Sequence, residues 1–176
     1  FKYLLRFMNY RQGVYRPQNP EKYKGNVDNV IYRSGWELAC FKWLDKKKEV
    51  TEWSSEEVVI AYVYEVDQKF HRYFIDLKFK MNGQVYIIEV KPKKETEPPK
   101  MGARKTKRYI TEGLTYVKNR NKWEAAEKYA KKRGWKFQVW TEEELERLHI
   151  LPKKLKKVPG KMKKLKPLRK PKKRAK

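Results

Sequence analysis

Apolar and polar residues alternate on both sides of Asn82-Gly83, in the stretch FHRYFIDLKFKMNGQVYIIEVKPKK. Asn-Gly is favoured at the centre of a type I′ turn, because both central residues of that turn need a positive φ. Alternation on both sides of such a turn is typical of a β-hairpin. If Met81 pairs with Gln84, the register of the whole hairpin follows from the turn.

This register predicts one apolar face and brings two carboxylates together on the other. The facing apolar pairs are Ile75 with Val90, Leu77 with Ile88, and Phe79 with Tyr86, and the opposite face pairs Lys80 with Val85, Lys78 with Ile87, and Asp76 with Glu89. Lys91 shares the face of Glu89, because side chains two residues apart in a strand point the same way. A slip of one residue would separate these groups.

Like charges that face each other across a hairpin are destabilising. The pair is therefore either an exposed one that Lys78 and Lys91 relieve, or a site for a hard divalent cation. In the second interpretation Asp76 and Glu89 bind Mg²⁺, or Mn²⁺ in its place, with the Val90 carbonyl as an extra ligand. Lys91 would position or deprotonate the attacking water, or balance charge that develops on a phosphate.

A second acidic residue of interest lies upstream, in the stretch YRSGWELACFKWL. Ser34 and Glu37 form the S-x-x-E pattern of a helix capping box, which predicts a helix from Ser34 to about residue 47. Glu37 falls on the same helical stripe as Phe41 and Leu44, so it is also expected to point toward the sheet. Both a capping role and a role at the carboxylate site, as a metal ligand directly or through water, remain open. The second predicts that Glu37 reaches toward Asp76 rather than back to Ser34.

The remaining pattern predicts one α/β domain with a mixed sheet between helices. The expected parts are an extended arm or irregular loop over 1–30, the domain over 31–150 and a basic tail over 151–176. Within the domain we expect a strand at 57–65, a helix at 104–133 that could break near VKNRN, a strand at 135–140 and a short helix after Thr141. A single cysteine excludes a disulfide framework. No apolar run approaches the ~20 residues of a membrane span, and no G-x-x-x-x-G-K-[ST] pattern supports a nucleotide cofactor.

The charge indicates a polyanionic partner. The formal net charge is +25, and residues 153–176 hold 14 Lys and Arg and no acid, which leaves +11 for the first 152 residues. We interpret this as nucleic-acid binding rather than membrane binding, since the tail has no amphipathic apolar face. The candidate phosphate contacts are Arg33, Arg72, Lys153, Lys154, Lys156 and Lys157. A surface role for the two arginines and a merely solvated tail are the alternatives.

The fragments FID and EVK resemble the motif of the PD-(D/E)XK nuclease superfamily, although Ile75 stands where that motif usually has Pro. Longer fragments, among them IYRSGWEL, EWSSEEVVIAY, HRYFIDLKFK, IIEVKP and NKWEAAEKYAKKRGWKFQVW, resemble the head-completion proteins of tailed bacteriophages, a family related in its core to the TnsA-type transposon endonuclease. The resemblance covers about residues 16–148.

The resemblance implies a restriction-endonuclease-like core with Glu37, Asp76, Glu89 and Lys91 as its catalytic residues. It implies action after DNA packaging, in the host cytoplasm during virion assembly or at the head–neck of the virion, with DNA and phage head and neck proteins as partners. The first hypothesis is an Mg²⁺-dependent DNA endonuclease. The alternative is a structural DNA-binding neck or head-closure protein with little or no turnover, and a basic packaging protein would leave the Asp76–Glu89 pair unexplained.

Overall fold

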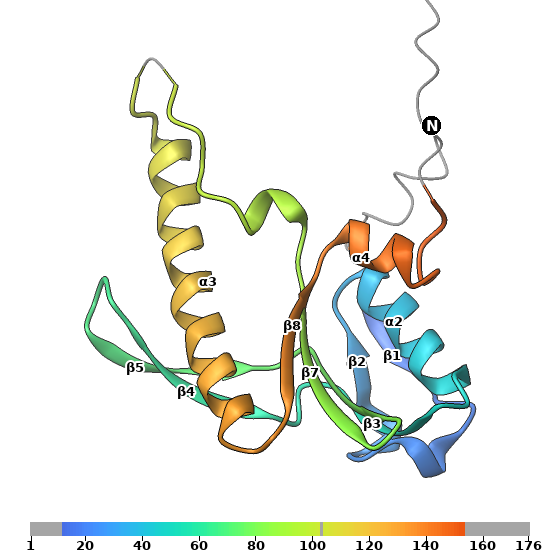
Figure 1. Cartoon of the computed structure of the whole chain (residues 1–176). Helices are drawn as coiled ribbons and strands as arrows, with labels where there is room; N and C mark the ends of the chain where they lie inside the picture. The colour runs from blue at the N-terminus through green and yellow to red at the C-terminus, as the bar shows by residue number, and fades with distance from the viewer. Residues whose placement is uncertain (1–11, 103, 154–176) are drawn as a thin grey trace, which may run out of the picture.

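A four-stranded mixed sheet forms the centre of the protein in the computed structural model, which describes residues 12–102 and 104–153 (Figure 1). Its strands, in spatial order, are β3 (Val50–Ser54), β6 (Leu77–Met81), β7 (Gln84–Val90) and β8 (Lys136–Trp140). The β7–β8 pair is parallel and the other two pairs are antiparallel. The fold is therefore α/β with a mixed sheet and flanking helices, consistent with a restriction-endonuclease-like core. Strand β3 was not predicted from the sequence.

The hairpin register is confirmed from Leu77 to Ile88. Met81 pairs with Gln84 and Leu77 with Ile88, as the turn predicts. Both central residues of the turn have a positive φ, 49° at Asn82 and 79° at Gly83.

The sheet separates two apolar cores, one on each face. Ile88 packs on the side of α2 (Gly35–Lys46) and of α4 (Glu142–Arg147), and Ile87 packs on the side of α3 (Lys107–Lys131). Adjacent residues of one strand point to opposite faces, so each of these two fully buried side chains belongs to a different core. Helix α3 is continuous through the VKNRN segment, where a break had been considered.

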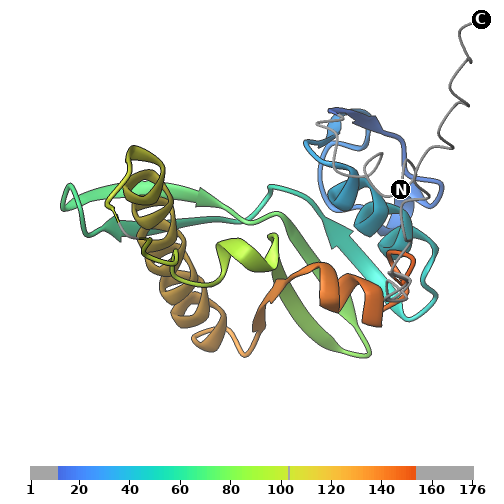
Figure 2. The same ribbon diagram turned by 90° about the horizontal axis from the view of Figure 1, so that it is seen from above.

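The expected continuous strand breaks at Ile75 and Asp76, which is a correction to the predicted hairpin. Strand β5 (Lys69–Phe74) pairs with β4 (Val59–Tyr64) as a separate two-stranded sheet, against which α3 packs (Figure 2). The backbone of Ile75 bonds to Val58 and Glu56 rather than to β7. Ile75 therefore packs in the core beside α3 and does not face Val90, since its backbone bonds are made with the segment just before β4.

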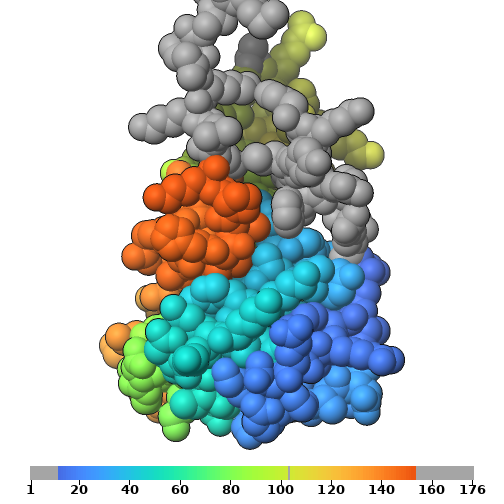
Figure 3. All heavy atoms as spheres, turned by 90° about the vertical axis from the view of Figure 1, so that its right-hand side faces the viewer, coloured from blue at the N-terminus to red at the C-terminus, as the bar shows by residue number. Residues whose placement is uncertain are grey.

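The described part of the expected arm folds onto the domain. It contains β1 (Gly13–Tyr15) paired with β2 (Val30–Tyr32), and the 3-10 helices η1 (Pro20–Lys22) and η2 (Val27–Asn29). Figure 3 shows this segment in blue against the α2 region and, beyond it, the α4 region in orange. The arm is therefore not a separate extended element over residues 12–30.

One buried carboxylate attaches the arm to α2. Asp45 is fully buried and accepts hydrogen bonds from the Tyr15 hydroxyl at 2.8 Å and from the backbone amides of Gln18 and Asn19 at 2.7 and 3.0 Å. These bonds give both carboxylate oxygens of Asp45 a hydrogen-bond donor, and they hold Tyr15 in the core beside Phe41.

Within the described residues, no helix is both long and apolar enough to cross a membrane.

Candidate active site

Asp76 lies at the junction of β5 and β6, where the strand leaves one sheet for the other. Its Oδ2 accepts a hydrogen bond of 2.7 Å from the backbone amide of Val90 on β7, so the side chain takes the place of a ladder carbonyl. Burial, followed by the nearby charge of Glu89, raises the pKa of Asp76 well above its ordinary value. The Glu89 carboxylate therefore lies close enough to disfavour the charged form of Asp76.

Glu89 is only 2% exposed, and its carboxylate is held by two side chains. The Tyr73 hydroxyl donates to Oε2 at 2.8 Å, and the Lys91 ammonium lies 3.4 Å from Oε1. Burial and the charge of Glu89 raise the pKa of Tyr73, so the phenol stays protonated and remains a donor. Asp76, Glu89 and Lys91 are thus brought together at one end of the hairpin.

The sequence did not point to Tyr73 as part of the site. In an unbroken strand, a residue three positions before Asp76 would project from the opposite face. The break at Ile75–Asp76 changes this, because it turns Tyr73 and Ile75 toward the α3 side, where Glu89 also lies.

Two lysines flank the carboxylates, and only Lys91 was expected. Burial lowers the pKa of Lys91, but the charges of Glu89 and Asp76 outweigh it, so the net shift is upward and the side chain is a cation. Lys122 on α3 has its Nζ 4.9 Å from the centre of the Tyr73 ring. Burial, opposed by the charge of Glu89, lowers the pKa of Lys122. No sequence signal distinguishes Lys122 from the many other lysines of this chain.

The Glu37 side chain turns back on its own helix terminus. Its Oε1 accepts from the Ser34 hydroxyl and its Oε2 from the Arg33 amide, each at 2.8 Å, while its own amide donates to the Ser34 hydroxyl at 3.1 Å. This is a variant of the capping box, in which Glu37 accepts from the amide of Arg33 and from the Ser34 hydroxyl rather than from the Ser34 amide. The expected reach toward Asp76 is not what the structure shows, because these nearby donors satisfy both oxygens. The Glu37 charge still contributes to the raised pKa of Asp76, after burial and the charge of Glu89.

The residues predicted to contact phosphate differ in exposure and in their partners. Arg33 is engaged with Glu56 through two hydrogen bonds of 2.9 Å, from Nε to Oε1 and from Nη2 to Oε2. Arg72 is exposed on β5, with its guanidinium 5.6 Å from the centre of the Phe74 ring. Lys153 is exposed at the end of the described chain, and Lys154, Lys156 and Lys157 lie outside the described residues.

The donor set of the carboxylate pair suits a hard divalent cation. Carboxylate oxygens are the ligands that Mg²⁺ and Mn²⁺ prefer, and a dication would relieve the repulsion that raises the pKa of Asp76. Within the described residues the Oδ1 atom of Asp76 makes no hydrogen bond, so it is available to a ligand. The described residues contain no group of three or more His, Cys, Asp or Glu arranged to hold a metal, so Glu37 does not complete a triad with the pair.

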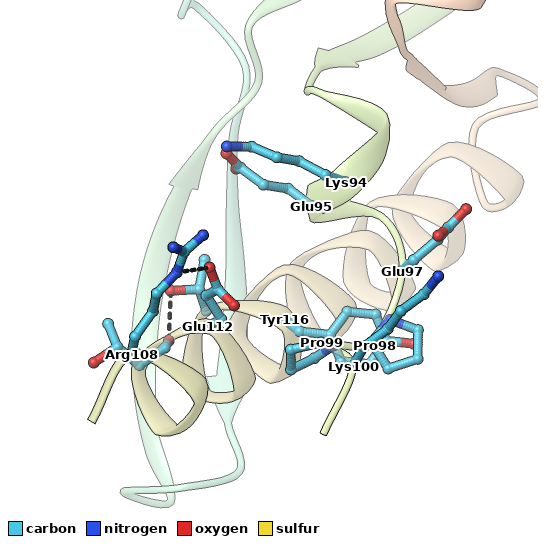
Figure 4. A pocket seen from close by; sticks show the side chains of 11 residues that line it. Lys94, Glu95, Glu97, Pro98, Pro99, Lys100, Arg108, Glu112 and Tyr116 are labelled. Atoms are coloured by element: carbon cyan, nitrogen blue, oxygen red, sulfur yellow. Dashed lines mark hydrogen bonds and ion pairs between the residues drawn. The ribbon is translucent and has the colours of Figure 1, made fainter. Parts of the chain in front are cut away.

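A groove of about 550 Å³ lies elsewhere, between the segment around Pro98 and the first half of α3 (Figure 4). Its ionic lining is balanced, with the cations Lys94, Lys100 and Arg108 and the anions Glu95, Glu97 and Glu112. Arg108 is already paired with Glu112 at 2.9 Å. None of Asp76, Glu89 and Lys91 lines this groove, so it is separate from the candidate site.

Comparison with known proteins identifies relatives of this chain. Residues 47–142, more than half of the chain, match the family described as TnsA-like endonuclease N terminal. The head completion nuclease of Enterobacteria phage T4 is 44% identical over 141 residues, which cover 77% of this chain and 94% of that protein. Asp76, Glu89, Lys91 and Lys122 lie inside the family match, whereas Glu37 precedes it. On these grounds, the chain belongs to the TnsA-like endonucleases, a family of the PD-(D/E)XK type.

Proposed function

We propose that this protein is a divalent-cation-dependent DNA endonuclease that acts in phage head completion. The observation that carries the proposal is the meeting of Asp76, Glu89 and Lys91 at one end of a hairpin, in a chain of an endonuclease family. The name of the phage T4 relative supports head completion as the setting. The host cytoplasm during virion assembly, with head and neck proteins as neighbours, is the corresponding location.

Asp76 and Glu89 would hold the cation, which is Mg²⁺ or Mn²⁺ by the chemistry of the donors. When bound, such an ion lowers the pKa of a coordinated water and neutralises charge on a phosphate. The protein's own contribution is to keep Glu89 oriented, through the Tyr73 hydroxyl, and to keep Asp76 aligned, through the amide of Val90. Carboxylates held in this way need little reorganisation when a ligand arrives.

Lys91 has the role of a cation in this proposal. Its raised pKa keeps it protonated at neutral pH, so it can donate to a phosphate oxygen but has no lone pair with which to remove a proton. Hydrolysis joins a water oxygen to phosphorus and breaks the bond from phosphorus to a deoxyribose oxygen. The negative charge that accumulates on the phosphate oxygens during this exchange is what Lys91 stabilises.

A specific observation favours the second candidate, a DNA-binding head-closure protein with little turnover. The Glu37 carboxylate is fully used by the capping box, so two carboxylates rather than three are brought together. The net charge of +25 fits this candidate as well as it fits the first.

Nicking of a supercoiled plasmid separates the two candidates. The parent protein is expected to convert supercoiled to open-circular DNA with Mg²⁺ and not in excess chelator, while Asp76→Ala, purified in parallel, should lose this activity and still bind DNA. If the parent and Asp76→Ala nick at the same rate, the activity comes from a contaminant and the endonuclease proposal fails. If neither nicks but both bind, the structural candidate stands.

A further inference from the structure

The β4–β5 sheet leaves one of its two faces uncovered. Ile60, Tyr62 and Tyr64 point toward α3 and are buried, whereas the alternate residues of β4 are exposed. Figure 2 shows α3 across one face of this hairpin, with no other helix or strand of the described residues drawn against the opposite face. The uncovered face is defined by three facing pairs: Val59 with Phe74, Ala61 with Arg72, and Val63 with Phe70. We call it the outer hairpin face.

The outer hairpin face is apolar to a degree that the composition does not predict. Phe70 is 81% exposed, and Val59, Val63 and Phe74 are each exposed by 43–44%. Of the nine large apolar side chains that are exposed in the described residues, five lie on this hairpin, if Val66 at its tip is included. An open sheet face normally carries polar residues, and this chain has 46 Lys and Arg to supply them. A single cation at the centre of such a face is a pattern found at protein interfaces, where aromatic residues and Arg are enriched.

Arg72 decides which partner this face suits. Arg72 belongs to the middle one of the three outward-facing pairs, and its guanidinium lies over the ring of Phe74 in the neighbouring pair. A second copy packed face to face about a two-fold axis would bring two such guanidiniums together in apolar surroundings, which is unfavourable. Duplex DNA is bound through rows of cations, and this face has one cation among six residues. An apolar surface with a carboxylate at its centre would satisfy Arg72 and bury the two phenylalanines.

We propose that the outer hairpin face docks a second protein, through an apolar patch that presents a carboxylate to Arg72. The ladder is roughly 20 Å long, so it would form the buried centre of an interface rather than its whole area. The acidic character of the partner also complements the strongly basic chain. The use of phage heads as the binding partner rests on the proposed function, whereas the outer hairpin face itself does not depend on Asp76 and Glu89.

The test uses the full-length chain and DNA-filled phage heads that were assembled without it. Co-sedimentation should show binding of the parent protein, and Val63→Ser/Phe70→Ser should weaken it about tenfold or more. Ile110→Ser is the matched control, because Ile110 is 53% exposed on α3 and lies outside the face. Plasmid nicking by Val63→Ser/Phe70→Ser should equal that of the parent, so a failure of docking and a failure of the nuclease proposal give different results.

A photo-crosslinking amino acid at position 70 identifies the occupant. The proposal expects a crosslink to a head protein near an Asp or Glu, with Arg72→Glu abolishing binding and the reverse substitution on that protein restoring it. A crosslink to a second copy, to this chain's own residues outside the described part, or to DNA would overturn the proposal. So would heads that fail to bind the parent, or that bind Val63→Ser/Phe70→Ser as tightly as the parent.

Discussion

Substitution of Tyr73 by Phe removes one hydroxyl from the site and leaves the rest of the ring in place. That hydroxyl is the donor to Oε2 of Glu89, at 2.8 Å, and the two side chains are 1% and 2% exposed. Without it, one oxygen of a buried carboxylate loses its partner, and water has little access to replace it. The substitution therefore tests whether Tyr73 orients Glu89 or only fills space.

The expected magnitude follows from the charge and the burial of the acceptor. A hydrogen bond to a charged group contributes about 1.5–3 kcal/mol. At about 2–4 °C per kcal/mol for a domain of this size, Tm should fall by roughly 3–12 °C in the metal-free protein. Loss of a group that orients a metal ligand lowers metal affinity or activity by about 10–100-fold, and we expect the same loss in plasmid nicking.

The assay is plasmid nicking over a range of Mg²⁺ concentrations, with Tm measured on the same preparations. Tyr62→Phe is the matched control, because Tyr62 is also buried beside Tyr73, and its hydroxyl makes no hydrogen bond within the described residues. The Tyr73→Phe protein should need more Mg²⁺ than either the parent or the control. The positioning role is refuted if Tyr73→Phe matches Tyr62→Phe in Tm, in nicking rate and in Mg²⁺ dependence.

Four further predictions concern other parts of the structure. Asp76→Asn should abolish nicking yet raise Tm of the metal-free protein at neutral pH, because the folded pKa of Asp76 is raised and its charge is therefore unfavourable. This gain in Tm should disappear as pH falls below the ordinary carboxyl range, and a gain that does not depend on pH would contradict the reasoning. Glu37→Gln keeps a competent capping box, so Tm should change little. If Glu37 leaves its cap to join the site, nicking should fall about 10–100-fold, as for the loss of an outer-shell group of a metal site. Unchanged nicking would assign Glu37 to the helix alone. Lys122→Met should reduce, by about 0.9, the steepness with which the logarithm of the duplex-DNA binding constant falls with the logarithm of salt concentration, as for one lost phosphate contact. The measurement uses an Asp76→Ala background, and an unchanged slope would exclude that contact. Asp45→Ala should lower the free energy of unfolding, measured by urea titration, by about 3 kcal/mol, since the buried Tyr15 hydroxyl loses its acceptor. A loss below about 1 kcal/mol would show that the arm does not depend on Asp45.

Much of the central hairpin and of the helix that follows the arm could be predicted from local rules. Asn82 and Gly83 adopt the positive φ values of a type I′ turn, and this turn sets the pairing from Met81 back to Leu77. Ser34 caps the helix where the S-x-x-E pattern places it, with the Glu37 amide donating to its hydroxyl. Such features depend on residues within a few positions of one another, so the sequence alone suffices to determine them.

The orientation and the partners of the side chains at the site depend on contacts between segments that are distant in the sequence. The strand breaks at Ile75 and Asp76 because the Ile75 backbone bonds to Val58 and Glu56, in the segment between β3 and β4. Only this break turns Tyr73 toward Glu89. Asp45 joins the arm to α2 through bonds that span 26 to 30 residues, and no local pattern encodes them. That two carboxylates and a lysine share one end of a hairpin follows from the turn and the alternation around it. Which groups hold them was decided by contacts distant along the chain, whose free energy depends on the whole packed fold.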